Sequence, residues 1–352
     1  MMPKKILLSF LMFFHFAAIA QTESKVVLVT IDGLRWQELF RGADSSLIYS
    51  RYNNQKDYLF KKFWHKDVQK RRALLMPFIW REVAKNGQII GNRDLKSYAS
   101  VSNPSKISYP GYAELFSGFV DSSITNNNRV YNKNQNLLRW LNQQESFKSK
   151  VASFSSWDVF NYILNDSVGD FVINAGIEDL EIPEMDESFK ALNEMQRLAP
   201  PFISDKVRLD VITYQLAKQY LKFYKPKFLH IGFDETDDMA HTADYKFYLE
   251  QARKSDDMIA DLWNYLQNDS FYKNQTALVI TTDHGRGEVP FGNWTSHGKS
   301  IPGSEQVWIA AIGPSISAKG EVKNTDEIFT KQIAGTLARL LDLNFNKDNV
   351  FK

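Results

Sequence analysis

The chain of 352 residues contains no cysteine. This absence excludes disulfide bonds, thiolate metal ligands, a cysteine nucleophile and a formylglycine made from cysteine. A surplus of positive charge is also missing, since 43 Lys and Arg residues face 41 Asp and Glu residues. A protein that holds nucleic acid on a basic face needs such a surplus to neutralise phosphates. We therefore expect no nucleic-acid-binding surface.

A long, mostly apolar run occurs only at the start of the chain. Residues 6–20 form this run, which follows Lys4 and Lys5 and ends in Ala18-Ile19-Ala20. It is shorter than the roughly 20 residues that span a bilayer, and its small-residue end is typical of a cleavable secretory signal. Residues 1–20 are thus predicted to be removed near Ala20 and Gln21, leaving a secreted or periplasmic protein without a membrane span. The alternative is an uncleaved membrane anchor.

Four short, nearly continuous apolar runs have the length of β-strands. Such runs suit a parallel sheet that is buried on both faces. Helix-length amphipathic segments alternate with them, which predicts an α/β fold: a doubly wound, mostly parallel central sheet flanked by helices. The expected strands are 26–31, 228–233, 277–282 and 307–312, and the expected helices are 58–85, 205–224, 244–268 and 326–341.

Residues 21–352 are predicted to form one catalytic domain. The stretch from about 128 to 226 differs from the rest, with Trp140, Trp157 and a Pro200-Pro201 break. We expect it to be an insertion or cap over one edge of the sheet. The alternative is that this stretch simply continues the pattern of sheet and helix.

Polar side chains follow the ends of three expected strands. Because ligands bind beyond the carboxyl ends of parallel strands, these side chains are predicted to converge. Carboxylates and imidazoles without sulfur suit a divalent metal, with Zn²⁺ or Mn²⁺ as the leading candidates. The residues are Asp32 after the first strand, Asp234, Glu235, Asp237, Asp238 and His241 after the second, Asp283 and His284 after the third, and His297 in the loop before the last strand.

The spacing of these residues leaves two interpretations open. Asp237 and His241 are four residues apart, so on a helix both point to one face and can bind one ion. The same acidic run also suits a helix N-terminus that binds no metal. Asp283 and His284 are adjacent, and both can serve one site only if the chain turns there, which Gly285 permits.

A candidate nucleophile comes from a different part of the chain. Ser108 stands just before a helix-like segment at 112–116. A serine at such a position can present its Oγ to a metal while backbone N–H groups face an incoming anion. Ser108 is equally well explained as an ordinary helix N-cap when it is considered alone.

Five short blocks in this order resemble the alkaline phosphatase superfamily. The similarity is strongest to its nucleotide pyrophosphatase/phosphodiesterase-like (type I phosphodiesterase) branch and to secreted proteins of the alkaline phosphatase family. The blocks span most of the mature chain. They are V-T-I-D-G-L-R at 29–35, S-Y-P-G-Y at 108–112, D-D-M-A-H at 237–241, T-D-H-G at 282–285 and H-G at 297–298.

The resemblance implies a site with two divalent ions, most favourably zinc, with manganese as an alternative. It also implies an asparagine that holds a phosphate oxygen, for which Asn127 is favoured among residues 126–128. The implied ligands are Asp237, His241 and His297 on one ion, and Asp32, Asp283, His284 and the oxygen of Ser108 on the other.

The sequence departs from the superfamily's patterns at two positions, and one of them bears on the class of enzyme. Sulfatases carry an arginine where the run from Ser108 ends in Tyr112, so a sulfatase is disfavoured. Ala240 replaces the usual glycine before the first metal-binding histidine, a small change. There is no clear counterpart of the additional Mg²⁺ site of the bacterial alkaline phosphatases.

The predicted function is an exported two-metal phosphate-ester hydrolase that forms a phosphoseryl intermediate on Ser108. Its partner is a small-molecule phosphate ester, and the sequence does not define an oligomeric state. Monoesters are slightly favoured over diesters. The alternatives are a phosphodiesterase or nucleotide pyrophosphatase, a phosphomutase-like transferase, and a non-catalytic module that retains metal. Candidate substrate contacts are Lys106, Arg129 and Arg286 for charge, and Tyr109, Tyr112, Trp157 and Trp294 for an apolar slot.

Overall fold

The computed structural model describes residues 23–50, 55–199, 204, 206–288, 293–346 and 349–351. The predicted signal peptide therefore lies outside the described residues. Within these ranges, none of the helices combines the length and the apolar character that crossing a membrane would require.

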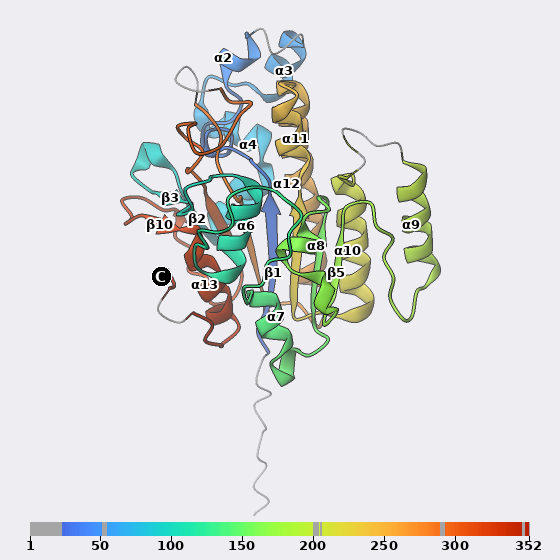
Figure 1. Cartoon of the computed structure of the whole chain (residues 1–352). Helices are drawn as coiled ribbons and strands as arrows, with labels where there is room; N and C mark the ends of the chain where they lie inside the picture. The colour runs from blue at the N-terminus through green and yellow to red at the C-terminus, as the bar shows by residue number, and fades with distance from the viewer. Residues whose placement is uncertain are drawn as a thin grey trace, which may run out of the picture.

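An eight-stranded sheet forms the centre of the molecule (Figure 1). Its strand order is β5-β4-β6-β1-β7-β8-β2-β9, and the run from β5 to β7 is parallel, whereas β8 is antiparallel to both β7 and β2. This mostly parallel α/β sheet confirms the predicted fold class. The strands are β1 Lys25–Ile31, β2 Gly87–Ile90, β4 Val151–Ser155, β5 Val172–Ala175, β6 Phe228–Phe233, β7 Thr276–Thr281, β8 Ile309–Ile312 and β9 Gly320–Glu321; β3 Ala99–Ser100 and β10 Ile328–Phe329 form a second, two-stranded sheet.

Helices cover both faces of the sheet, which explains why β1 is apolar along its whole length. Val27 and Val29 pack with α10 and α12, whereas Val26 and Leu28 pack with α6 and α13 on the other face. The helices are α1 Trp36–Arg41, α2 Ser45–Ile48, α3 Lys56–Phe63, α4 Val68–Leu75, α5 Ala84–Asn86, α6 Ser108–Ser117, α7 Leu137–Asn142, α8 Phe160–Ile163, α9 Glu187–Leu198, α10 Asp210–Tyr224, α11 Glu235–His241, α12 Tyr245–Asn268 and α13 Ile333–Leu340, with a π-helix at Ile79–Val83 and 3₁₀ turns at Arg93–Leu95, Glu145–Phe147, Asp166–Val168 and Thr330–Gln332.

Two predicted helices differ strongly from the structure, and a third, 205–224, is helical only from Asp210. The segment 58–85 is divided into α3, α4, the π-helix and α5, because Asp67 caps a new helix by accepting bonds from two backbone N–H groups and Pro77 follows the end of α4. The segment 326–341 begins with β10 and a 3₁₀ turn before α13. Both differences come from local start and stop signals inside an amphipathic pattern.

The range 128–226, expected to form an inserted cap, supplies part of the central sheet instead. It contains β4 and β5, which pair in parallel with β6 and with each other, and α10, which packs on the sheet. Serine and asparagine interrupt these strands, so they lack the continuous apolar run that marks β1 and β6. Within this range, α9 stands to the side of the molecule, beyond α10 (Figure 1).

Candidate active site

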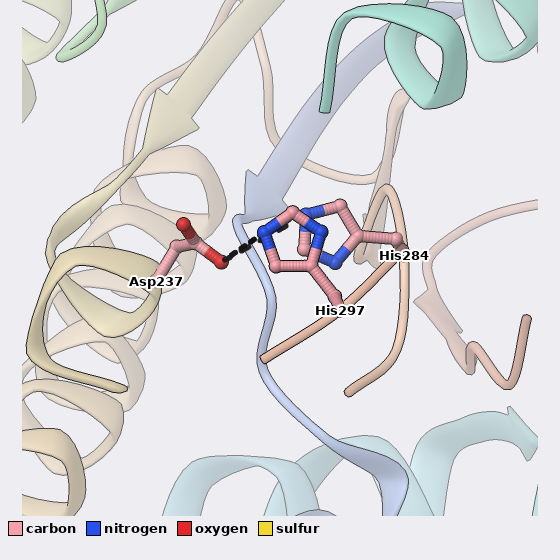
Figure 2. A group of neighbouring side chains, drawn as sticks. All are labelled: Asp237, His284 and His297. Carbon is pink, nitrogen blue, oxygen red and sulfur yellow. Dashed lines mark ion pairs between the residues drawn. The ribbon is translucent and has the colours of Figure 1, made fainter. Parts of the chain in front are cut away.

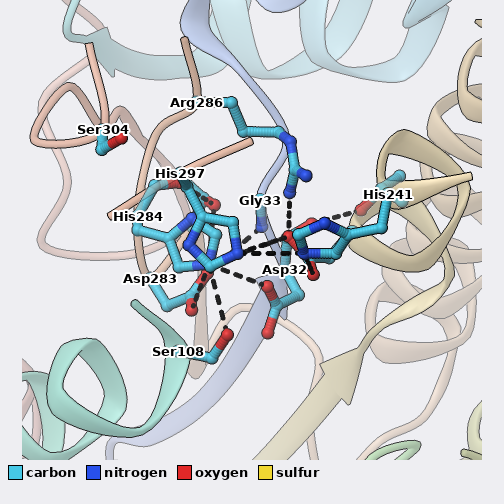
Figure 3. A network of polar contacts seen from close by, with 12 residues as sticks. Asp32, Gly33, Ser108, His241, Asp283, His284, Arg286, His297 and Ser304 are labelled. Atoms are coloured by element: carbon cyan, nitrogen blue, oxygen red, sulfur yellow. Dashed lines mark hydrogen bonds and ion pairs between the residues drawn. The ribbon is translucent and has the colours of Figure 1, made fainter. Parts of the chain in front are cut away.

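The predicted site residues meet where three neighbouring strands end. β1 lies between β6 and β7 in the sheet, so the residues that follow these strands share one edge. Ser108, the first residue of α6, and the loop that carries His297 reach the same place (Figure 3). The sequence prediction that these side chains converge is therefore matched by their positions.

The first group consists of Asp32, Asp283, His284 and Ser108. The Nε2 atom of His284 lies 3.3 Å from Oδ1 of Asp32, 3.4 Å from Oδ2 of Asp283 and 3.2 Å from Oγ of Ser108. All four residues are buried. Among the residues that the structure describes, none donates a hydrogen bond to either carboxylate oxygen of Asp32 or to Oδ2 of Asp283.

The second group consists of Asp237, His241 and His297. The Nε2 atom of His241 is 3.0 Å from Oδ2 of Asp237 and 3.0 Å from Nε2 of His297, which is 3.7 Å from Oδ1 of Asp237. His284 joins the two groups, because its Nε2 is 3.8 Å from Asp237 and its ring stacks on His297 with 3.8 Å between centroids (Figure 2).

The carboxyl groups of the site differ in their electrostatics. Burial, followed by the charge of Asp237, raises the pKa of Asp32 well above its usual range. Burial and then Asp32 do the same to the pKa of Asp283. Burial would also raise the pKa of Asp237, but Arg286, His297 and His241 together lower it well below its usual range. Asp32 and Asp283 therefore repel each other, whereas the negative charge of Asp237 is balanced by the positive charge of Arg286.

These groups fit the two divalent cations that the superfamily resemblance implies. Asp32 and Asp283 supply buried oxygens without hydrogen-bond donors, and a cation beside them would relieve their mutual repulsion. Burial, and then His284, lower the pKa of His297 to about 2, so that imidazole is neutral as a metal ligand must be. The donor set of oxygen and nitrogen suits Zn²⁺ or Mn²⁺.

The start of α11 is fixed by an exchange of hydrogen bonds with α10. The N–H groups of Asp234 and Glu235 donate to the two carboxylate oxygens of Asp210, and the N–H of Asp210 donates to Oε2 of Glu235. The carboxyl group of each helix start thus satisfies the backbone of the other. Asp237 and His241 follow on one face of α11, as their four-residue spacing predicts.

Glycine is required at position 33, directly after Asp32. Gly33 has a φ of +58°, and a Cβ there would lie 2.5 Å from Oδ1 of Asp237 and 2.8 Å from the guanidinium of Arg286. Its N–H donates to Oδ1 of Asp283 at 3.2 Å. A side chain at this position would push the two groups of the site apart.

One residue that the sequence analysis missed connects the two histidine loops. The carbonyl of Ser304 accepts a hydrogen bond from the N–H of Gly285, and its Oγ accepts one from the N–H of Gly298, at 2.9 and 3.0 Å. Ser304 thereby holds the turn after Asp283 and His284 against the loop of His297 (Figure 3). The Gly- and Ser-rich character of residues 296–304 was the available signal.

Asn127 lies beside the proposed nucleophile but contacts its neighbour. Its Oδ1 accepts a hydrogen bond of 2.9 Å from the N–H of Tyr109, the residue after Ser108, and its side chain is exposed. This orientation leaves the amide nitrogen as a donor. A contact of Asn127 with phosphate is therefore taken up below as a proposal.

The other candidate substrate contacts are mostly engaged elsewhere. Lys106 pairs with Glu305 at 2.8 Å and Arg129 pairs with Asp158. Arg286 is buried against Asp237. The apolar slot is not formed as expected, because three of its four rings, those of Tyr109, Tyr112 and Trp294, are buried in the protein, while Trp157 is half-buried.

The sheet order and the flanking helices define an α/β fold that is similar to the structure of a protein in the alkaline phosphatase superfamily from Vibrio parahaemolyticus. The sequence profile described as "Type I phosphodiesterase / nucleotide pyrophosphatase" matches residues 44–315, well over half of the chain. The chain therefore belongs to this family of phosphoric ester hydrolases. The matched range includes every predicted site residue except Asp32.

Solved structures show the same fold at low sequence identity. Wild-type alkaline phosphatase PafA has 12% identity and a TM-score of 0.58, over 92% of this chain and 96% of that one. Phosphonate monoester hydrolase of Agrobacterium radiobacter has 13% identity and a TM-score of 0.55, over 91% of this chain and 74% of that one. Lipoteichoic acid synthase LtaP from Listeria monocytogenes has 12% identity and a TM-score of 0.56, over 93% of this chain and 74% of that one. A search of curated proteins gives no match.

Proposed function

We propose that the protein hydrolyses phosphate esters, with Ser108 as the nucleophile and two divalent cations, most favourably Zn²⁺ with Mn²⁺ as the alternative, as cofactors. One observation carries this proposal. The hydroxyl of Ser108 lies 3.2 Å from Nε2 of His284, which is also close to Oδ1 of Asp32 and Oδ2 of Asp283, two buried oxygens that accept no hydrogen bond from the described residues. A serine that merely capped its helix would not need these partners.

The two groups of side chains have separate roles in this mechanism. Asp32, Asp283 and His284 would hold one cation beside Ser108, and Asp237, His241 and His297 would hold the other. Bound cations would supply charge to the phosphoryl oxygens, activate the nucleophile and stabilise the leaving oxygen. In the first step Oγ of Ser108 forms a bond to phosphorus while the bond to the ester oxygen breaks. Water then cleaves the phosphoserine.

The chain also positions the substrate. Because Oδ1 of Asn127 is held by the N–H of Tyr109, its amide nitrogen is proposed to donate to a phosphoryl oxygen next to Ser108. Burial and then His284 lower the pKa of His297 to about 2, which favours the neutral imidazole that a cation needs as a ligand.

A specific observation favours phosphodiesters over the monoesters that the sequence analysis slightly preferred. A monoester is a dianion and calls for an additional positive charge around its oxygens. The three candidate cations, Lys106, Arg129 and Arg286, are each paired with a carboxylate. A diester has one charge fewer and suits this environment better.

The test compares zinc-loaded wild type with Ser108→Ala on bis(p-nitrophenyl) phosphate and p-nitrophenyl phosphate. We expect faster turnover of the diester by wild type, and loss of both activities in Ser108→Ala with its zinc content unchanged. Ser105→Ala, three residues earlier in the same loop, is the control and should retain activity.

Trapping of the intermediate separates the alternatives. Acid quench during turnover should leave a phosphoryl group on Ser108 of the wild type, which is phosphate when the substrate is p-nitrophenyl phosphate and p-nitrophenyl phosphate ester when the substrate is the diester. Zinc without phosphoserine or turnover would indicate a binding module, and transfer of phosphate to a sugar hydroxyl instead of water would indicate a mutase-like transferase. Activity retained in Ser108→Ala would refute the role of this serine.

We also propose that residues 1–20 direct export, as their charged start, apolar run and small-residue end support. Expression of the full chain in a bacterial host, followed by N-terminal sequencing of the protein in the periplasm or medium, checks this. The expected mature N-terminus is Gln21. Retention of Met1 in a membrane fraction would refute cleavage.

A further inference from the structure

Arg286 is a buried side chain that joins two parts of the candidate site. It follows His284 by two residues and is 1% exposed. Its Nη1 donates to Oδ1 of Asp237, its Nε donates to the carbonyl of Trp294 at 3.0 Å, and its Nη2 donates to the carbonyl of Thr295 at 2.6 Å (Figure 3). The guanidinium therefore bonds in two directions at once.

These bonds link ligands that come from different segments. Asp237 lies on α11, after β6, whereas Thr295 is two residues before His297 in the loop that precedes β8. Arg286 itself follows β7. With Oδ1 of Asp237 bonded to Arg286, Oδ2 is the oxygen that faces His241, at 3.0 Å. The guanidinium thus sets both the orientation of Asp237 and the position of the His297 loop.

We infer that Arg286 is the positioning residue of the cation site formed by Asp237, His241 and His297, an inference that rests on the proposed function. The sequence analysis considered Arg286 as a substrate contact, but its Nε, Nη1 and Nη2 each donate to an acceptor within the protein. Its planar fork of donors can hold a carboxylate and two carbonyls together, which an ammonium group cannot do.

The direction in which cation affinity changes when Arg286 is removed tests the inference. A buried positive charge beside Asp237 reduces the attraction of this group for a cation, because Arg286 and Asp237 have opposite formal charges. If charge alone mattered, removal of Arg286 would strengthen cation binding there. If Arg286 positions the ligands, its removal weakens binding. Partners that orient metal ligands typically contribute about 10–100-fold to metal affinity.

The experiment titrates metal-free protein with Zn²⁺ in competition with a chromophoric chelator. Wild type should bind two equivalents. In Arg286→Met, we expect one equivalent to lose about 10–100-fold in affinity while the other is unchanged. Arg286→Lys keeps the charge but not the fork, and should show the same selective loss.

A matched control is available in Arg139. It is also buried, and it too holds one carboxylate and two backbone carbonyls, those of Asp170, Leu164 and Asn165, none of which is a proposed ligand. Arg139→Met should therefore bind both equivalents as wild type does. Circular dichroism of each metal-free variant checks its fold, and Arg286→Lys decides the question if Arg286→Met does not fold.

The outcomes separate this inference from the proposed function. Unchanged or tighter binding of both equivalents in Arg286→Met, or wild-type affinity in Arg286→Lys, would overturn the positioning role alone. Failure of the wild type to bind two equivalents of Zn²⁺ would instead overturn the two-cation proposal on which it rests.

Discussion

The two groups of the site solve the problem of buried charge in opposite ways. Asp32 and Asp283 lie side by side, accept few hydrogen bonds and have raised pKa values. Asp237 is surrounded by Arg286 and two histidines and has a lowered pKa. His241 in the second group is 48% exposed, whereas Asp32, Asp283 and His284 are almost completely buried. Asp32 and Asp283 need an added cation to offset their repulsion. Asp237 already has a cationic partner within the chain, the guanidinium of Arg286.

The largest expected effect is on the stability of the metal-free protein. Asp237→Asn leaves Arg286 buried without its carboxylate and should lower the free energy of unfolding by about 3 kcal/mol. Asp32→Asn removes a repelling carboxylate and should raise it by about 1 kcal/mol. Urea unfolding at pH 8 with chelator present measures both. Equal destabilisation by the two substitutions would contradict the comparison.

A smaller effect should appear in the pH dependence of stability. Because the folded-state pKa values of Asp32 and Asp283 are raised, their contribution is complete below the unfolded value of about 4 and is lost as pH rises through the folded values. Asp237 has a lowered pKa, so its contribution is present at neutral pH and is lost only in acid. Metal-free wild type should therefore become less stable as the pH rises from the unfolded value of about 4 through the raised pKa values of these two groups.

Single substitutions check which carboxyl groups cause this slope. Asp283→Asn should flatten the dependence on pH in this range. Asp237→Asn removes one of the charges that raise the pKa values of Asp32 and Asp283 and should reduce the slope less. Thermal unfolding with chelator, followed across this range, measures it. Stability that rises with pH in metal-free wild type would be inconsistent with raised pKa values for Asp32 and Asp283.

The smallest expected effect concerns the connection between the histidine loops. Ser304→Ala removes the acceptor for the N–H of Gly298 and should cost about 1 kcal/mol of stability. It should also weaken one zinc equivalent several-fold, since the loop of His297 loses its support. Ser300→Ala, an exposed position in the same loop, is the control for zinc titration. Equal zinc binding by the two variants would show that Ser304 does not support the site.

Much of the fold follows from local patterns in the sequence. The apolar run at 228–233 coincides with β6, and the run at 26–31 lacks only the first residue of β1. The run at 277–282 is shifted by one residue from β7, and β8 begins two residues after the start of the run at 307–312. β4 and β5 lie within the expected cap, and Ser153, Ser155 and Asn174 interrupt their apolar pattern, so neither was predicted as a strand. Their place in the sheet depends on pairing with distant segments, which a local pattern does not contain.

The candidate site was predictable where residues follow strands, and less so where loops meet. Asp32, Asp237 and Asp283 follow neighbouring strands, so their convergence could be inferred from the sheet alone. The contacts of Arg286 and Ser304 join loops that are separated in sequence, and they depend on how those loops pack. Arg286 was therefore considered as a substrate contact, whereas its donors bond to Asp237 and to two backbone carbonyls. The catalytic and metal-binding roles themselves stay predictions.

The crosswise bonding of Asp210 and Glu235 has a further consequence for how mutations spread through this protein. The two helix starts cannot separate unless three backbone amides lose their acceptors together. A substitution that shifts the beginning of α10 therefore also shifts the beginning of α11. Engineering of the surface around α9 and α10 should thus spare the first turn of α10, because a change there reaches Asp237 without touching any residue that binds substrate.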